Sequence, residues 1–139
     1  MKTIFLITLS WVLVSRVGAQ ELSVVVQNVH RNQGELLIAV FNQDQGFPFS
    51  SEQAVKTLKT AASRSSVAIK IGSLPPGRYA LALFQDANQD GKLNTNWLGI
   101  PKEGYGVSNN IFPTFRAPHF QEAAFPFPQQ SELTIQMKY

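Results

Sequence analysis

The stretch Pro75–Gly91, with the sequence PPGRYALALFQDANQDG, sets the interpretation of the whole chain because it holds a clear strand signal and the loop that follows it. After the Pro-Pro-Gly turn signal, large apolar residues occupy every second position: Tyr79, Leu81 and Leu83. Period-two alternation predicts a β-strand with one buried face and one face in water. The alternation stops at Gln85, where a segment rich in Asp and Asn begins.

Four further segments show the same alternation on either side of this strand. Their apolar positions are Leu22, Val24 and Val26; Leu36, Ile38 and Val40; Val67, Ile69 and Ile71; and Leu133, Ile135 and Met137. Residues 120–125 predict a less regular strand. Several short strands separated by turn signals indicate an all-β chain, and we expect a Greek-key β-sandwich of about seven strands. Its expected core residues are Val24, Ile38, Ile69, Leu81, Leu83 and Ile135.

Two segments depart from this pattern. Residues 50–58 place Gln53 three positions after Ser50, which is the spacing of a helix capping box, so we expect one short helix there. Between Phe84 and Phe120 the alternation is absent, and glycines and prolines recur. This stretch has too many aromatic and apolar residues for a disordered tract. We therefore expect a long ordered loop over one end of the sandwich.

The segment after the strand, residues 86–94, carries oxygen-bearing side chains at alternate positions, followed by a glycine. In calcium-binding loops this spacing turns alternate side chains toward the ion, and the glycine permits the sharp backbone turn. The expected ligands are three side chains, one backbone carbonyl and one water-mediated amide: Asp86, Asn88, Asp90, Lys92 and Asn94. The segment thus predicts Ca²⁺ as the one candidate cofactor.

The match to a calcium loop is incomplete. An EF-hand loop carries a bidentate Glu at its twelfth position, which is Trp97 in this sequence, and the segment follows a strand rather than a helix. A carboxylate from elsewhere has to complete the shell, and the candidates are Glu103, Asp44 and Glu122. The alternative is a polar turn without an ion, since Asp, Asn and Gly also suit turns. Both interpretations stay open.

The N-terminal residues match a secretory signal peptide. A positive start at Lys2 precedes the apolar run of residues 3–14, and Val17-Gly18-Ala19 has the small residues of a cleavage site. The run is shorter than the roughly 20 apolar residues of a membrane-spanning helix. We predict residues 1–19 as signal peptide, residues 20–139 as a single β-sandwich domain, and secretion to the bacterial periplasm or exterior. We expect no membrane span.

The composition excludes several kinds of functional site and partner. With no cysteine, the sequence has no disulfide, no thiolate metal site, no cysteine nucleophile and no site for a lipid anchor. Without Lys2 and Arg16, the twelve basic residues fall to ten against nine Asp and Glu, and they are scattered along the chain. We expect no nucleic-acid partner, because such a partner requires a concentrated basic face. His30 and His119 lack a third imidazole for a zinc site, so we interpret them as ordinary surface or loop residues.

The sequence contains no recognisable pair of nucleophile and base. Asp86 and Asp90 belong to one loop, whereas glycosidase carboxylates face each other across a cleft. We therefore expect no catalytic residues and no enzyme activity.

Residues 74–93 and 96–110, together with the Phe47-Pro48 turn, resemble the bacterial family catalogued as domain of unknown function 2141. The resemblance covers nearly the whole chain after the signal peptide and implies a secreted or periplasmic β-sandwich of undefined activity, with no catalytic residues to carry over. Gln85 stands where the family leads us to expect a histidine. More loosely, the sequence is similar to transthyretin-like and collagen-adhesin B-type sandwich domains, which often serve as stalks or accessory modules. This looser similarity informs the fold alone.

We expect a non-enzymatic binding or accessory module with an unknown envelope or extracellular partner. The alternative is a carbohydrate-binding module whose loop aromatics stack on sugar rings. The candidate ligand-contact residues are Trp97, Tyr105, Asn109 and Asn110, and the other loop aromatics are Phe112 and Phe115. We favour burial of these rings as a small core that holds the loop down, because aromatic rings gain much from burial.

Overall fold

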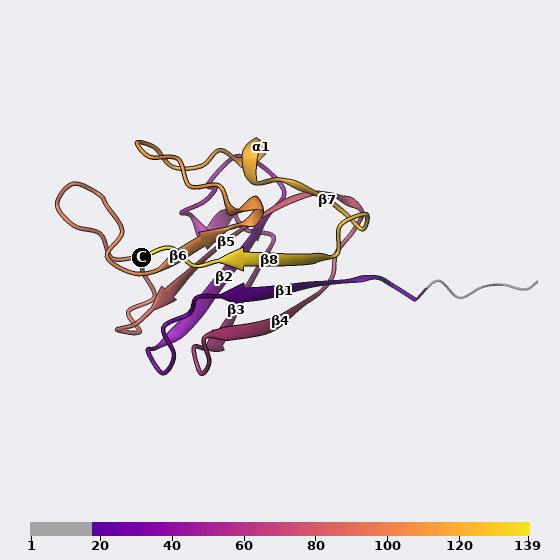
Figure 1. Ribbon diagram of the computed structural model, residues 1–139. Coiled ribbons are helices and arrows are strands. Elements are labelled where there is room, and N and C mark those ends of the chain that lie inside the picture. Colours follow the sequence, from indigo (N-terminus) through magenta and orange to yellow (C-terminus); the bar gives the residue numbers. More distant parts are fainter. Residues whose placement is uncertain (1–17) are drawn as a thin grey trace, which may run out of the picture.

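The computed structural model describes residues 18–139, so most of the predicted signal peptide lies outside the described part of the chain. Residues 18–139 form eight strands in two sheets (Figure 1). The strands are β1 (Glu21–Gln27), β2 (Glu35–Phe41), β3 (Lys56–Ala61), β4 (Ser66–Ser73), β5 (Gly77–Asp86), β6 (Tyr105–Val107), β7 (Phe125–Phe127) and β8 (Glu132–Gln136). The helical segments are the α-helix α1 (Phe120–Ala123) and the 3₁₀ turns η1 (Ser51–Gln53) and η2 (Ser108–Asn110).

The two sheets have the strand orders β4-β1-β8 and β3-β2-β5-β6, and β7 pairs with the beginning of β5. β1 pairs antiparallel with β4 and parallel with β8. After β3 and β4, the chain returns in β5 to lie beside β2, which is the Greek-key arrangement. The predicted all-β sandwich is therefore confirmed, with eight strands in place of about seven.

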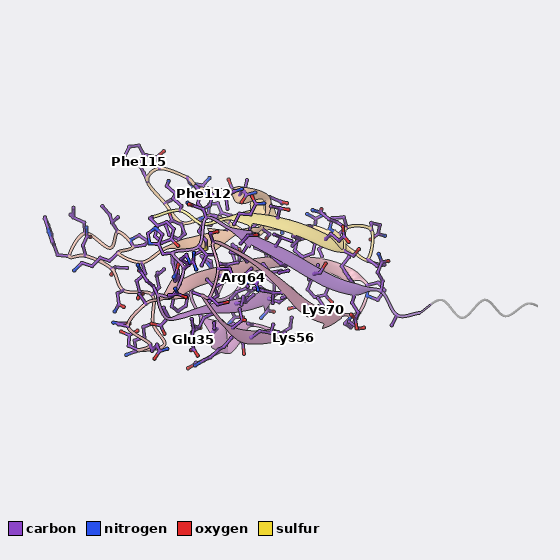
Figure 2. The ribbon with its side chains drawn as sticks, turned by 60° about the horizontal axis from the view of Figure 1, so that its bottom comes forward. Glu35, Lys56, Arg64, Lys70, Phe112 and Phe115 are labelled. Carbon is purple, nitrogen blue, oxygen red and sulfur yellow. The ribbon has the colours of Figure 1, made fainter. Side chains whose placement is uncertain are left out.

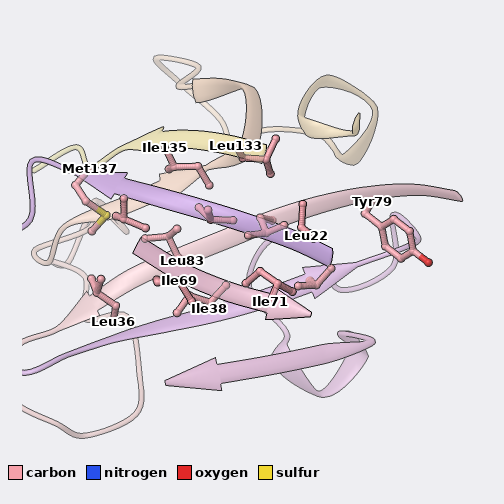
Figure 3. Close-up of a cluster of buried hydrophobic side chains, with 14 of the residues drawn as sticks. Leu22, Leu36, Ile38, Ile69, Ile71, Tyr79, Leu83, Leu133, Ile135 and Met137 are labelled. Carbon is pink, nitrogen blue, oxygen red and sulfur yellow. The ribbon is translucent and has the colours of Figure 1, made fainter. Parts of the chain in front are cut away.

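The main hydrophobic core fills the space between the two sheets (Figure 3). Every apolar position predicted from the alternation lies in this core, except Val67, which is partly buried and packs against it. All six expected core residues are confirmed, and their side chains are less than a tenth exposed. The period-two pattern therefore identified the inner faces of β1, β2, β4, β5 and β8 correctly.

A second, smaller core lies on the other face of β5. Its buried members are Phe41, Ala80, Ala82, Val107, Phe120, Ala123 and Ala124. The buried hydroxyl of Ser108 joins the two layers, since it accepts a hydrogen bond from the Leu81 N–H (2.9 Å) and donates one to the Ala123 carbonyl (2.6 Å). The expectation that this face of β5 meets water was wrong, because α1 covers its alanines.

The helix predicted over residues 50–58 was also wrong. Only η1 is helical there, and Ser50 makes no side-chain capping hydrogen bond. From Lys56 onward the chain forms β3, which pairs along β2 and packs Leu58 against the main core. Pairing with an open sheet edge outweighed a weak local capping signal. Within residues 18–139, no helix has the length and apolar character required to span a bilayer.

The strand expected over residues 120–125 is in fact the short helix α1, and β7 begins only at Phe125. The Glu122 side chain accepts a hydrogen bond from the His119 N–H at the start of this helix (2.8 Å). The long stretch between Phe84 and Phe120 is divided by β6 and η2 into two loops, residues 87–104 and 111–119.

The edge strands β3 and β4 lie on the same side of the sandwich, and this side carries basic side chains. Lys56 and Lys70 project from this side, with Arg64 in the turn between the strands (Figure 2). Lys59 of β3 lies 3.9 Å from Glu35 of β2. Charged side chains on edge strands generally discourage pairing with another sheet.

Replacing Leu81 with Ala should lower the free energy of unfolding by about 2–5 kcal/mol, because Leu81 is fully buried and the truncation leaves a cavity. Equilibrium urea denaturation measures the change. Leu98→Ala is the matched control: this leucine is largely exposed, and its truncation should change stability by less than about 0.5 kcal/mol. Equal effects of the two substitutions would show that the buried face of β5 is misassigned.

Candidate functional site

The candidate site is the 87–104 loop, which leaves the sandwich at the end of β5. Asp86, the last residue of β5, pairs with Glu35 at the start of β2. The loop projects from this end of the molecule and returns in β6 (Figure 1). Of the five predicted calcium ligands, Asp86 ends β5, and Asn88, Asp90, Lys92 and Asn94 lie in the first part of the loop.

Asp86 is the anchor of the loop. Its side chain is 1% exposed, and its two carboxylate oxygens accept hydrogen bonds from the N–H groups of Asp90 (3.1 Å) and Gly91 (2.7 Å). The turn also requires positive φ at Gln89 and Gly91, and glycine adopts that conformation at low cost. The buried carboxylate thus receives backbone donors that would otherwise lack a partner.

Asp90 organises the outer half of the turn. It accepts hydrogen bonds from the Lys92 N–H (2.9 Å) and from the Asn94 side-chain amide (2.9 Å). These bonds, with that from Asn94 the largest, lower the pKa of the Asp90 carboxyl, because they stabilise its charged form. Asn88 donates to Asp90 as well (3.2 Å).

Glu103 closes the base of the loop. Its carboxylate accepts hydrogen bonds from the N–H groups of Ala87 (3.0 Å) and Asn94 (3.0 Å), one from each arm. Among the three remote carboxylates considered from the sequence, Glu103 is the one that reaches this turn. Glu122 instead forms an ion pair with Arg116, which lowers the pKa of Glu122 to about 2.

The donor set of this turn suits a hard cation, since it consists of carboxylate, amide and carbonyl oxygens. The side-chain oxygen of Asn94 is buried without a hydrogen-bond partner, which leaves one acceptor free for an ion or a water. Among residues 18–139, however, no three His, Asp or Glu side chains are grouped so that they could hold a metal. A calcium ion here would therefore rely on Asp86 and Asp90, with amide and carbonyl oxygens completing the shell.

The outer part of the loop is a tight turn built around Asn96. The side-chain oxygen of Asn96 accepts hydrogen bonds from the N–H groups of Leu98 (2.9 Å) and Ile100 (3.0 Å). The Asn96 N–H donates to the Ile100 carbonyl (2.9 Å), and Gly99, at positive φ, donates to the Asn96 carbonyl (3.0 Å). Backbone and side-chain hydrogen bonds thus fix the conformation of this turn.

The side chains that this turn presents are apolar. Trp97 is 91% exposed, Leu98 61% and Ile100 55%. We call residues 95–101 the apolar tip. The expectation that the loop aromatics bury themselves was therefore wrong for Trp97. The turn is ordered by the hydrogen bonds of Asn96 and not by burial of this ring.

The other loop aromatics divide into two groups. Tyr105 and Phe112 meet edge to face, with ring centroids 5.7 Å apart, and the Lys138 ammonium lies 5.4 Å from the Phe112 ring centre. These two rings contact each other but are only partly buried, so the expected small core is limited to this one pair. Phe115 is 98% exposed at the outer part of the 111–119 loop, whereas Phe112 lies nearer its base (Figure 2).

Asn109 and Asn110, the remaining candidate ligand-contact residues, brace η2. The Asn109 amide donates to the carbonyls of Glu122 (3.1 Å) and Ala124 (3.2 Å). Asn110 donates to the Thr134 carbonyl (3.1 Å) and accepts from the Gln136 N–H (2.8 Å). Both have positive φ, and their amides are already used to join α1 and β8 to η2.

Sequence reasoning missed a polar pocket of about 220 Å³ beside the base of the loop. Its lining includes His30, Gln85, Lys102, Glu103 and Tyr139. The His30 and Tyr139 rings stack 3.6 Å apart, and burial raises the pKa of the Tyr139 hydroxyl. The signal in the sequence was the position of Gln85, a polar residue that follows Tyr79, Leu81 and Leu83 in the alternation of apolar positions.

Gln85 holds the wall of this pocket. Its side-chain N–H groups donate to the carbonyls of His30 (2.5 Å) and Gln33 (2.7 Å). Its oxygen accepts from the His30 N–H (3.0 Å) and the Tyr139 hydroxyl (2.5 Å). All four hydrogen-bonding positions of the amide are filled, so Gln85 is a structural clamp between the β1–β2 turn and the C-terminal segment.

Comparison with known proteins adds one result. The family model described as "Uncharacterized protein conserved in bacteria (DUF2141)" matches residues 24–136. No curated protein and no solved structure gives a significant match to the chain. The match covers the sandwich from β1 to β8, so the chain belongs to the DUF2141 family.

Proposed function

We propose that this DUF2141 protein is a secreted, non-enzymatic binding or accessory module that engages a component of the bacterial envelope or exterior through its apolar tip. The observation that carries the proposal is the exposure of Trp97 on a turn whose conformation is fixed by hydrogen bonds. Contiguous exposed apolar side chains on an ordered surface are typical of interaction sites.

The use of the polar side chains supports binding rather than catalysis. Both carboxylate oxygens of Asp86 accept backbone N–H groups, and the Ser108 hydroxyl is fully buried between β5 and α1. Neither group is presented to a substrate. The Gln85 amide is equally committed to backbone partners and Tyr139.

Secretion rests on the N-terminal sequence. The apolar run of residues 3–14 and the small residues at positions 17 and 19 have the order of a signal peptide. We expect the exported chain to begin at Gln20, and intact-mass measurement of the protein recovered from periplasm or medium tests this. A mass that includes residues 1–19 would contradict the proposed processing.

The apolar tip should carry binding to the envelope. We expect a chain with both Leu98→Ser and Ile100→Ser to be retained at least about tenfold less on washed bacterial envelopes than the parent chain, since two aliphatic contacts are lost. Co-sedimentation measures the retained fraction, and thermal unfolding checks that both chains fold.

Phe49→Ser is the matched control for this experiment. Phe49 is also largely exposed, but it lies in the loop after β2, and β2 ends at the opposite end of β5 from Asp86. Retention should be unchanged by this substitution. If the parent chain, the double variant and Phe49→Ser are all retained equally, the tip does not carry the binding.

Calcium at residues 86–94 is the second part of the proposal. An ion bound by Asp86, Asn88, Asp90 and the Lys92 carbonyl, with Asn94 and Glu103 beside it, would lie at the base of the loop that carries the tip. Ordering a loop costs about 1–2 kcal/mol of conformational entropy per residue. An ion that binds only the folded form offsets part of this cost.

Calcium should raise the thermal midpoint of the native chain. The stabilisation is about 2.7 kcal/mol when calcium is in hundredfold excess over its dissociation constant, which is roughly 10⁻⁴–10⁻³ M in extracellular modules. We compare unfolding in CaCl₂ and in EGTA. Asp86→Ala should unfold at one temperature in both, whereas Asp44→Ala, which changes an exposed aspartate of another loop, should keep the calcium effect. Identical midpoints for the native chain would exclude the ion.

A carbohydrate-binding module is the second candidate, favoured by the exposed ring of Trp97. Exposed aromatic rings stack on sugar faces, but sugar sites also need polar groups that meet the hydroxyls. The flanking side chains on the tip are Leu98 and Ile100, which offer no hydrogen bonds. Retention on purified cell-wall polysaccharide, lost on Trp97→Ala, would favour this candidate.

A further inference from the structure

The apolar tip combines three features that together specify the chemistry of its partner. It presents one indole and two aliphatic side chains, it is held rigid, and basic residues flank it. Trp97, Leu98 and Ile100 lie within four consecutive positions, so one small area carries all three exposed apolar groups.

The rigidity of the tip comes from its own polar atoms. Asn96 accepts two backbone N–H groups, and Thr95 pairs with Pro101 across the neck of the turn. A second backbone hydrogen bond, from the Lys102 N–H to the Asn94 carbonyl (2.8 Å), closes the neck. The tip therefore meets a partner without having to be ordered first, which lowers the entropic cost of binding.

The charged side chains around the tip are of both signs. Lys92 and Lys102 flank it and are exposed, and neither forms an ion pair in the described part of the chain. The nearest carboxylates, Asp90 and Glu103, accept hydrogen bonds at the base of the loop: Asp90 from the Lys92 N–H and the Asn94 amide, and Glu103 from the N–H groups of Ala87 and Asn94. The apolar tip is thus flanked by two exposed ammonium groups, whereas the nearby carboxylates are engaged in hydrogen bonds at the base of the loop.

This combination matches the surface of an anionic lipid bilayer. Indole rings favour the interface between headgroups and acyl chains, where one edge is apolar and the other is wet. Aliphatic side chains insert to the same depth, and lysines near the surface bind anionic headgroups. A sugar would use the indole but gain little from the two aliphatic side chains.

We propose that residues 92–102 dock on an anionic lipid surface, with Trp97, Leu98 and Ile100 inserted at the acyl boundary and Lys92 and Lys102 over the headgroups. The proposal rests on the proposed binding function and names its partner. The remaining sandwich stays in water, since the tip projects from one end of the molecule (Figure 1).

The chain provides its own reporter for this insertion. Its two tryptophans are Trp11 and Trp97, so the chain beginning at Gln20 keeps only Trp97. All eight strands lie within residues 21–136, and this chain therefore retains the whole sandwich. Transfer of the exposed indole into the interface shifts its emission to shorter wavelength and shields it from a soluble quencher.

The experiment mixes this chain with vesicles of phosphatidylcholine alone and of phosphatidylcholine with phosphatidylglycerol. We expect a blue shift and co-sedimentation with the anionic vesicles, both weakened by salt. Lys92→Ala with Lys102→Ala should reduce binding about 25-fold, at roughly fivefold per lysine. Leu98→Ser with Ile100→Ser should reduce it by more than about tenfold, while Phe49→Ser at the opposite end should leave it unchanged.

Three outcomes would overturn the proposal: no blue shift with anionic vesicles, equal binding to both vesicle types, or a tip variant that binds like the parent chain. Each variant is first shown to unfold at the parent temperature, so loss of binding is not loss of fold. If whole envelopes retain the chain through the tip but the vesicles do not, the lipid proposal fails and the binding function stands. If neither retains it, both fail.

Discussion

Strand β5 is buried on both faces, and the rest of the molecule is arranged around it. Leu81 and Leu83 meet the other sheet in the main core, whereas Ala80 and Ala82 lie in the second core with α1. Along its edges β5 pairs with β2, β6 and β7. A strand enclosed in this way fixes the position and direction in which the chain leaves its last residue, Asp86. The 87–104 loop therefore begins from a rigid base.

The base of that loop is held by buried or partly buried carboxylates rather than by apolar packing. The Asp86 carboxylate accepts hydrogen bonds from two backbone N–H groups of the turn that follows it. The Glu103 carboxylate accepts two more, from the N–H groups of Ala87 and Asn94. Backbone N–H groups that are buried at the base of the loop need hydrogen-bond acceptors, and an ionised carboxylate is a strong acceptor. Because these polar contacts order the loop, its large apolar side chains are not needed to hold it down. They remain exposed at the tip.

The sandwich is held by apolar packing and the loop by polar contacts, and this difference explains what the sequence could and could not predict. Alternation identified the inner faces of β1, β2, β4, β5 and β8, since a half-buried strand leaves a period-two pattern. It failed at β3 and α1, where the outcome depended on a neighbouring sheet edge and on covering Ala80 and Ala82. The spacing of Asp86, Asn88 and Asp90 located the turn. The exposure of Trp97 could not be predicted from its apolar character, because it depends on the conformation of a turn in which Asn96 accepts two backbone N–H groups.

The proposed calcium ion and the proposed docking surface belong to one loop, so they are thermodynamically linked. An ion that restricts the base of the loop lowers the entropy that docking of the tip has to remove, and docking then strengthens ion binding by the same factor. The size of this coupling depends on how much freedom the loop keeps without the ion. Asp86, Glu103 and Asn96 already supply hydrogen bonds at its base and tip. We therefore expect the coupling to be small, with the ion acting mainly on stability and the tip on binding.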